Sequence, residues 1–88
     1  MRYMAEYVSK SGKMVSKYYE DGINEVRRTV VREIKKKNYK SAVIWKEDKM
    51  GIYPIAMIGF RQSISKWVWI SNTDGTYIIS PNGNIRKL

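Results

Sequence analysis

Seven basic side chains between Arg27 and Lys40 are the residues whose types and spacing best suit a specific chemistry. The only acid among them is Glu33, so this segment holds much of the formal net charge of +9 that the 88-residue chain carries. Ammonium and guanidinium groups bind phosphate and carboxylate oxygens through charge-assisted hydrogen bonds. The segment therefore predicts a polyanionic partner: nucleic acid, an anionic membrane surface or an acidic protein.

A helical projection gathers some of these cations on one surface. With successive residues about 100° apart, four of them share about 100° of helix surface, and the other three flank that surface. The predicted contact residues are Arg28, Arg32, Lys35 and Lys36, flanked by Arg27, Lys37 and Lys40. Lys10 and Lys13, in the predicted loop at residues 9–13, are expected as outlying contacts. The alternative is a solvated helix face that is basic only for solubility.

Catalytic groups are scarce in this sequence. It contains no cysteine and no histidine, which removes thiolate and imidazole metal ligands and the usual general base near neutral pH. Glu47, Asp48 and Lys49 match half of a metal-dependent nuclease site, but a charged hairpin turn explains the same residues. We therefore expect no enzymatic activity, no metal and no cofactor.

The segment Asp21 to Lys37 positions the cations, because it alone shows a sustained helical period. Ile23, Val26, Val30 and Ile34 fall within about 80° of one another and form an apolar stripe. Asp21 is predicted to cap the first turn, and Asn38 suits the left-handed residue that ends a helix.

The rest of the chain shows strand and turn patterns. Two short runs rich in tyrosine and valine, separated by a loop that contains Gly12, predict an N-terminal hairpin. Further β-rich runs follow the helix, and Pro54 in one of them predicts a sheet edge or a bulge. The predicted strands are Tyr3–Val8, Met14–Tyr19, Ser41–Lys46, Ile52–Phe60, Ile64–Ser71, Thr76–Ser80 and Asn84–Leu88.

Apolar residues occupy both faces of these strands. Since side chains alternate along a strand, Val68 and Ile70 lie on the face opposite Trp67 and Trp69. We predict that Val68 and Ile70 face the helix, which leaves an aromatic face with Trp45, Trp67 and Trp69 to be covered otherwise. That face is buried by the hairpin or by curling of the sheet, forms a homodimer interface, or stacks unpaired bases.

These elements predict one α+β domain spanning residues 1–88. An N-terminal β-hairpin, one amphipathic helix and a three- to five-stranded antiparallel meander share a core. No run approaches the ~18 apolar residues of a membrane span, and no signal peptide is apparent, so a cytoplasmic location is expected. The residues predicted to be buried are Ile23, Val26, Val30, Ile34, Ile44, Ile58, Val68 and Ile70.

The leading functional prediction is a small basic accessory protein that binds nucleic acid, DNA or RNA, through phosphates on the helix face. The alternative is a small interaction protein, of the kind encoded by phages and mobile elements, that inhibits or redirects an acidic protein partner. That alternative uses the same basic helix together with the aromatic sheet face. Charge alone cannot separate the two, because an acidic protein and a phosphate backbone present similar potentials.

Overall fold

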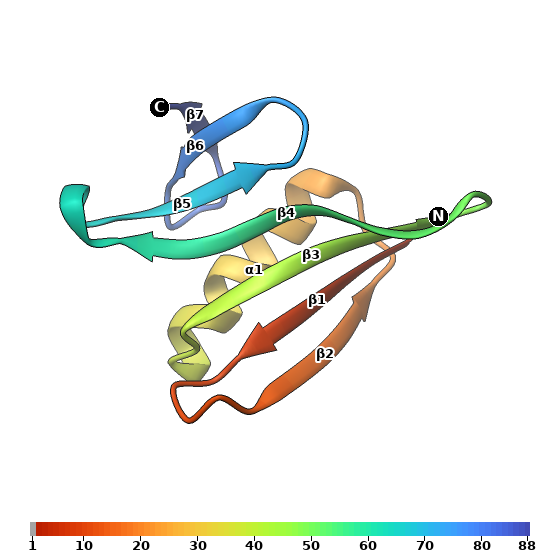
Figure 1. Ribbon diagram of the computed structural model, residues 1–88, viewed down its shortest axis with the longest axis horizontal. Helices are drawn as coiled ribbons and strands as arrows, with labels where there is room; N and C mark the ends of the chain where they lie inside the picture. Colours follow the sequence, from red (N-terminus) through yellow and green to blue (C-terminus); the bar gives the residue numbers. More distant parts are fainter. Residues whose placement is uncertain (1) are drawn as a thin grey trace.

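The computed structural model describes residues 2–88 and has one antiparallel seven-stranded sheet with one helix on one face (Figure 1). Across the sheet the strand order is β2-β1-β3-β4-β5-β6-β7. The N-terminal hairpin therefore extends the sheet at one edge, and the five strands after the helix form the predicted meander. The elements are β1 (Arg2–Val8), β2 (Met14–Tyr19), α1 (Ile23–Lys37), β3 (Ser41–Asp48), β4 (Gly51–Arg61), a 3-10 turn η1 (Gln62–Ile64), β5 (Lys66–Ser71), β6 (Gly75–Ile79) and β7 (Ile85–Lys87).

The helix confirms the predicted period but begins later than Asp21. Gly22 occupies the cap position with no side-chain hydrogen bond, and its carbonyl accepts from the Val26 amide at 3.0 Å. The predicted role of Asp21 as the cap is therefore wrong. Asn38 ends the helix in the left-handed conformation, with φ 58° and ψ 42°, as predicted.

A bulge in β4 explains how Pro54 is tolerated within the sheet. β4 is an interior strand, and its register against β3 shifts between Ile44 and Trp45, which leaves Ile55 as an extra residue. The Ile55 carbonyl accepts from the Asn72 amide at 3.0 Å, so the displaced backbone is still hydrogen-bonded. This confirms the predicted bulge, and Pro54 also lies in a part of β4 that pairs only with β3, because β5 pairs with residues 56–61 of β4.

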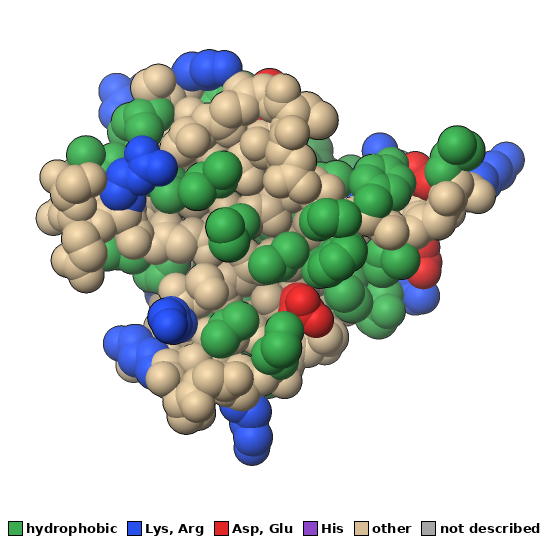
Figure 2. Space-filling model, viewed as in Figure 1, with side chains coloured by type: hydrophobic (Ala, Val, Ile, Leu, Met, Phe, Trp, Pro, Cys, Tyr) green, Lys and Arg blue, Asp and Glu red, His purple; other side chains and the backbone are tan. Residues whose placement is uncertain are grey.

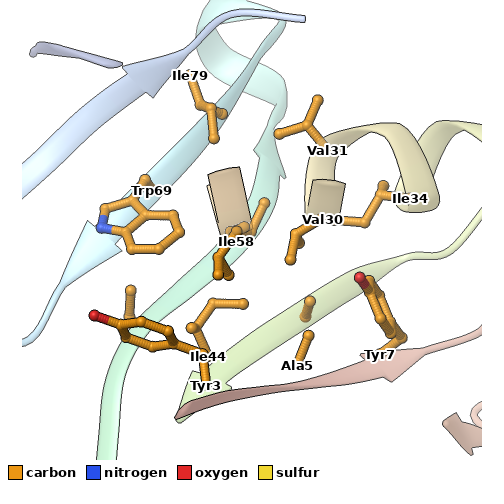
Figure 3. Packing of buried hydrophobic residues seen from close by; sticks show 13 residues of the cluster. Tyr3, Ala5, Tyr7, Val30, Val31, Ile34, Ile44, Ile58, Trp69 and Ile79 are labelled. Carbon is orange, nitrogen blue, oxygen red and sulfur yellow. The ribbon is translucent and has the colours of Figure 1, made fainter. Parts of the chain in front are cut away.

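The hydrophobic core lies between α1 and the sheet face that it covers (Figure 3). Helix residues Val30 and Ile34 meet the strand residues Ile44 and Ile58, and each of the four is at most 2% exposed. Of the eight residues predicted to be buried, Val26, Val30, Ile34, Ile44, Ile58 and Val68 are buried, whereas Ile23 and Ile70 are only partly buried.

The two sheet faces are assigned the other way round from the prediction. Trp69 of β5 is paired with the core residue Ile58 of β4, and it is 4% exposed. Half-buried Trp67 also packs against the core that the helix covers. Val68 and Ile70 lie on the opposite face instead. Alternation along β5 separates the two pairs as expected, but it cannot indicate which pair meets the helix.

The face turned away from α1, here called the outer face, carries apolar side chains across its middle and cations mostly around its rim (Figure 2). Trp45 lies on this face, because it pairs with Met4 while its neighbour Ile44 is in the core. The three tryptophans therefore do not share one face. Met57 and Tyr18, 47% and 50% exposed, belong to the outer face by register.

No helix within residues 2–88 is long and apolar enough to cross a membrane.

Candidate nucleic-acid interface

Five exposed cations lie close together in the sequence, in the last two turns of α1 and the connection that follows. Arg32 and the three lysines that end the helix project into solvent, and Lys40 follows them in the connection to β3. The helix dipole places about half a negative charge at this end, which four lysines outweigh several-fold. The set is Arg32, Lys35, Lys36, Lys37 and Lys40, and it is called the basic end of the helix below.

Arg28 belongs to the predicted set, but the structure gives it local partners. Its Nε donates to the Asn82 carbonyl at 3.0 Å, and its guanidinium forms an ion pair with Glu25. Gly83 packs against the Arg28 backbone from the same turn between β6 and β7. These contacts tie the C-terminal hairpin to the first half of the helix, so Arg28 has a structural role in addition to its charge.

Arg27 lies apart from the basic end and is turned toward the sheet. Its guanidinium carbon lies 5.6 Å from the centre of the Trp69 ring, and it donates a hydrogen bond to Asn24. Burial lowers the pKa of Arg27, but a guanidinium remains charged at any physiological pH. Arg27 therefore covers one edge of the core rather than flanking the other cations.

Glu33, the only acid in the basic segment, is paired with Lys17 of β2 across the helix–sheet boundary. The hydrogen bond from Lys17 lowers the pKa of Glu33, so this carboxylate stays ionised and compensated. The positive charge of Lys17 on β2 therefore offsets the negative charge of Glu33. The field of the basic end is consequently not cancelled from within the helix.

A groove of about 680 Å³ opens beside the basic end of the helix. Three segments far apart in the sequence meet there: the loop after β1, the end of α1 with its connection to β3, and the turn from β4 to β5. In Figure 1 these segments lie at the same side of the molecule. The groove is lined by Lys10, Ile34, Lys35, Asn38, Tyr39, Lys40, Ser41, Phe60, Gln62 and Trp67.

Aromatic rings and lysines share this groove. Phe60 is 44% exposed, and its ring meets that of Trp67 edge to face, with 5.6 Å between centroids. Tyr39 is held by stacking on Tyr7 at 4.8 Å. Lys10 was predicted only as an outlying contact, and Phe60 was not predicted as a site residue, because nothing local in the sequence signals that β4 and the first loop approach the helix end.

The residues that resemble half of a nuclease site have ordinary structural contacts. Glu47 forms an ion pair with Arg2, and Asp48 accepts hydrogen bonds from the Met50 amide and the Tyr53 hydroxyl, at 2.8 and 2.7 Å. The Tyr53 hydrogen bond, and secondarily the Met50 amide, lower the pKa of Asp48. Within residues 2–88 no three carboxylates approach one another closely enough to hold a metal ion.

A second hollow, of about 790 Å³, lies next to this hairpin and is less suited to a polyanion. Its lining mixes Arg2 and Lys49 with the acids Glu20, Glu47 and Asp48. Opposite charges at similar distances from a phosphate largely cancel in their effect. The groove beside α1, whose lining residues include three lysines and no acid, is therefore the better candidate.

Comparison of the chain with models of protein families, with curated proteins and with solved structures finds no match. Its function therefore has to be inferred from its own residues.

Proposed function

We propose that the protein binds nucleic acid through the phosphate backbone, with the basic end of the helix as the contact surface. One observation carries this proposal: Lys10 from the first loop and Lys35 and Lys40 from the helix end line the same acid-free groove. Cations contributed by distant segments to one groove concentrate positive potential more than a solvated helix face requires. Phosphates neutralised there release condensed counterions, which favours binding at low salt.

We propose a smaller set of contact residues than the one predicted from the helical projection. Arg32, Lys35 and Lys36 keep their proposed roles as exposed cations, with Lys37 and Lys40 beside them. Arg27 and Arg28 already contact Trp69 and the turn at Asn82, so we propose that they support the surface rather than contact phosphates. Lys10 joins the set.

Fluorescence anisotropy with labelled DNA and RNA tests the proposal directly. If about four phosphates are neutralised, log affinity for duplex DNA falls against log salt concentration with a slope near −3.6. The double variant Lys35→Gln, Lys40→Gln, which removes two of the lysines that line the groove, should reduce the magnitude of that slope by about two. Absence of binding by the folded, monodisperse protein at about 50 mM salt would contradict the proposal.

A matched control separates local from overall charge. Lys49 lies at the turn between β3 and β4, and Arg86 lies on β7, and neither lines the groove. The double variant Lys49→Gln, Arg86→Gln changes the net charge by the same two units. We expect it to keep nearly the wild-type slope, and an equal loss in both double variants would assign binding to net charge alone.

A second candidate function, docking on a protein, is favoured by the uncovered outer face of the sheet. Met14, Tyr18 and Met57 are each about half exposed there, and methionine adapts readily to different partner surfaces. Large exposed apolar patches are uncommon on monomeric proteins and often mark interfaces. The partner proposed for this face is a second copy of the chain.

A further inference from the structure

We propose that the groove beside the basic end of the helix binds an unpaired base, which makes single-stranded nucleic acid the preferred ligand. This inference rests on the proposed function, because the lysines must hold the backbone for a base to reach the groove. It adds to that function a preference for single-stranded over double-stranded nucleic acid, and the place where one base binds. The exposed ring of Phe60 and the half-buried ring of Trp67 form the stacking surface.

The composition of the groove is the first argument. Binding a phosphate backbone needs cations, but it does not need an aromatic pair beside them. Phe60 keeps 44% of its surface exposed although a core residue, Ile58, lies two positions earlier on the same strand face. Sites for single strands combine a positive groove with aromatic rings, because every base offers a face for stacking.

The rigidity of the groove is the second argument. Tyr39 stacks on Tyr7, whose hydroxyl is hydrogen-bonded to that of Tyr19 at 2.7 Å, and Trp67 is held edge to face by Phe60. Asn38 has the fixed backbone of a helix cap. A preformed groove loses little conformational entropy when a base enters.

Size and polarity fit one nucleotide with its backbone. The volume of about 680 Å³ falls within the range of about 300–1,000 Å³ for small-molecule sites. Asn38, Ser41 and Gln62 add amide and hydroxyl groups, which can donate to and accept from the edge of a base. A duplex keeps its bases paired and stacked, so only its phosphates can meet this surface.

The main test compares a 12-nucleotide oligothymidylate with a duplex of equal length at one salt concentration. Phe60→Ala should weaken single-strand binding by roughly 5- to 150-fold, the range found when one stacking residue is removed, and leave duplex binding unchanged. Tyr18→Ala is the matched control, because Tyr18 is similarly exposed but lies on the outer face, and it should change neither affinity.

Tryptophan emission provides a second measurement if Phe60→Ala fails to fold. Trp67 lines the groove, whereas Trp45 lies on the outer face and Trp69 is buried. Oligothymidylate should quench the emission of the wild-type protein. The Trp67→Phe variant should lose that quenching but retain the affinity within about threefold, because phenylalanine still offers an aromatic ring for stacking.

The outcomes separate this inference from the proposed function. No binding of either strand form would remove both. Equal binding of single strand and duplex with Phe60→Ala unaffected, or single-strand binding without quenching, would overturn the inference and leave phosphate binding in place. Selective loss of single-strand affinity together with Trp67-dependent quenching would support it.

Discussion

Gly83 shows how one residue fixes the position of the C-terminal hairpin on the helix. It has a φ of +90°, and a Cβ added there would lie 2.2 Å from Arg28 Cγ and 2.6 Å from Arg28 Cα. The backbone of Arg28 is held within the helix, so it cannot move aside as a flexible side chain could. We predict that Gly83→Ala lowers the free energy of unfolding by about 2–4 kcal/mol, measured by urea denaturation.

Gly12 supplies the control for this substitution. It has the same φ of +90° but nothing within 4 Å of the position of an added Cβ. Gly12→Ala should therefore carry only the conformational cost of about 1–2 kcal/mol. Equal losses in the two variants would mean that the contact with Arg28 contributes nothing.

The hydroxyl of Tyr7 makes stability sensitive to alkaline pH. Tyr7 is fully buried and hydrogen-bonded to Tyr19, and burial, the largest cause, followed by this hydrogen bond, raises the pKa of Tyr7. A raised pKa means that the folded protein keeps a proton that the unfolded chain releases near pH 10. The stabilisation is therefore complete below about pH 10 and is lost as pH rises above it.

The Tyr7→Phe variant tests this prediction. Above about pH 10 the difference in free energy of unfolding between wild type and variant should shrink by about 1.4 kcal/mol per pH unit. Below pH 9 the difference should be constant, because tyrosine is neutral in both states there. A constant difference up to pH 11 would contradict the assigned pKa shift.

At the scale of elements, the sequence predicted the helix and each strand to within a few residues. Alternation and helical period are local signals, and they fix which side chains share a face. They do not say which face of a strand meets the helix, and for that reason Trp69 was assigned to the wrong side. The cap predicted at Asp21 was wrong although aspartate is the better cap residue, because Gly22 is only slightly less favourable at that position and the sequence lets the helix begin after either residue.

The two sides of the sheet can be distinguished by a pair of tryptophan substitutions. Trp69 lies in the core, whereas Trp45 is partly exposed on the outer face. Trp69→Ala should cost about 3–5 kcal/mol of unfolding free energy or prevent folding, and Trp45→Ala should cost about half of that or less. Urea denaturation followed by circular dichroism measures both. The reverse order would place the helix on the opposite face.

For the whole molecule, the distribution of charge matters more than its sum. The net charge and the basic segment were evident from composition, but the groove was not, because Lys10 and Phe60 reach it through tertiary contacts with a helix far along the chain. Predicting such a site from sequence requires the strand order. The strand order in turn places the first loop and the turn after β4 at the same end of the helix.

The outer face leads to a prediction of self-association. The molecule measures 38 × 30 Å across its two longest axes, which is room for the about 800 Å² per partner of a standard interface. A two-fold axis would place Met57 of β4 near its equivalent in a second copy, with the basic end of each helix left free. We predict a concentration-dependent dimer in sedimentation velocity that persists at about 0.5 M salt, because apolar burial is not screened.

Met57→Lys should abolish this dimer, because each copy would bury a lysine in the interface, while the free energy of unfolding of the monomer stays nearly unchanged. Met50→Lys is the control: it adds the same charge at a residue that is 90% exposed in the β3–β4 turn, so it should leave the dimer intact. A monomer at all concentrations would exclude a second copy as the partner of the outer face. A dimer lost equally in both variants would instead show that added net charge, not the apolar face, governs association.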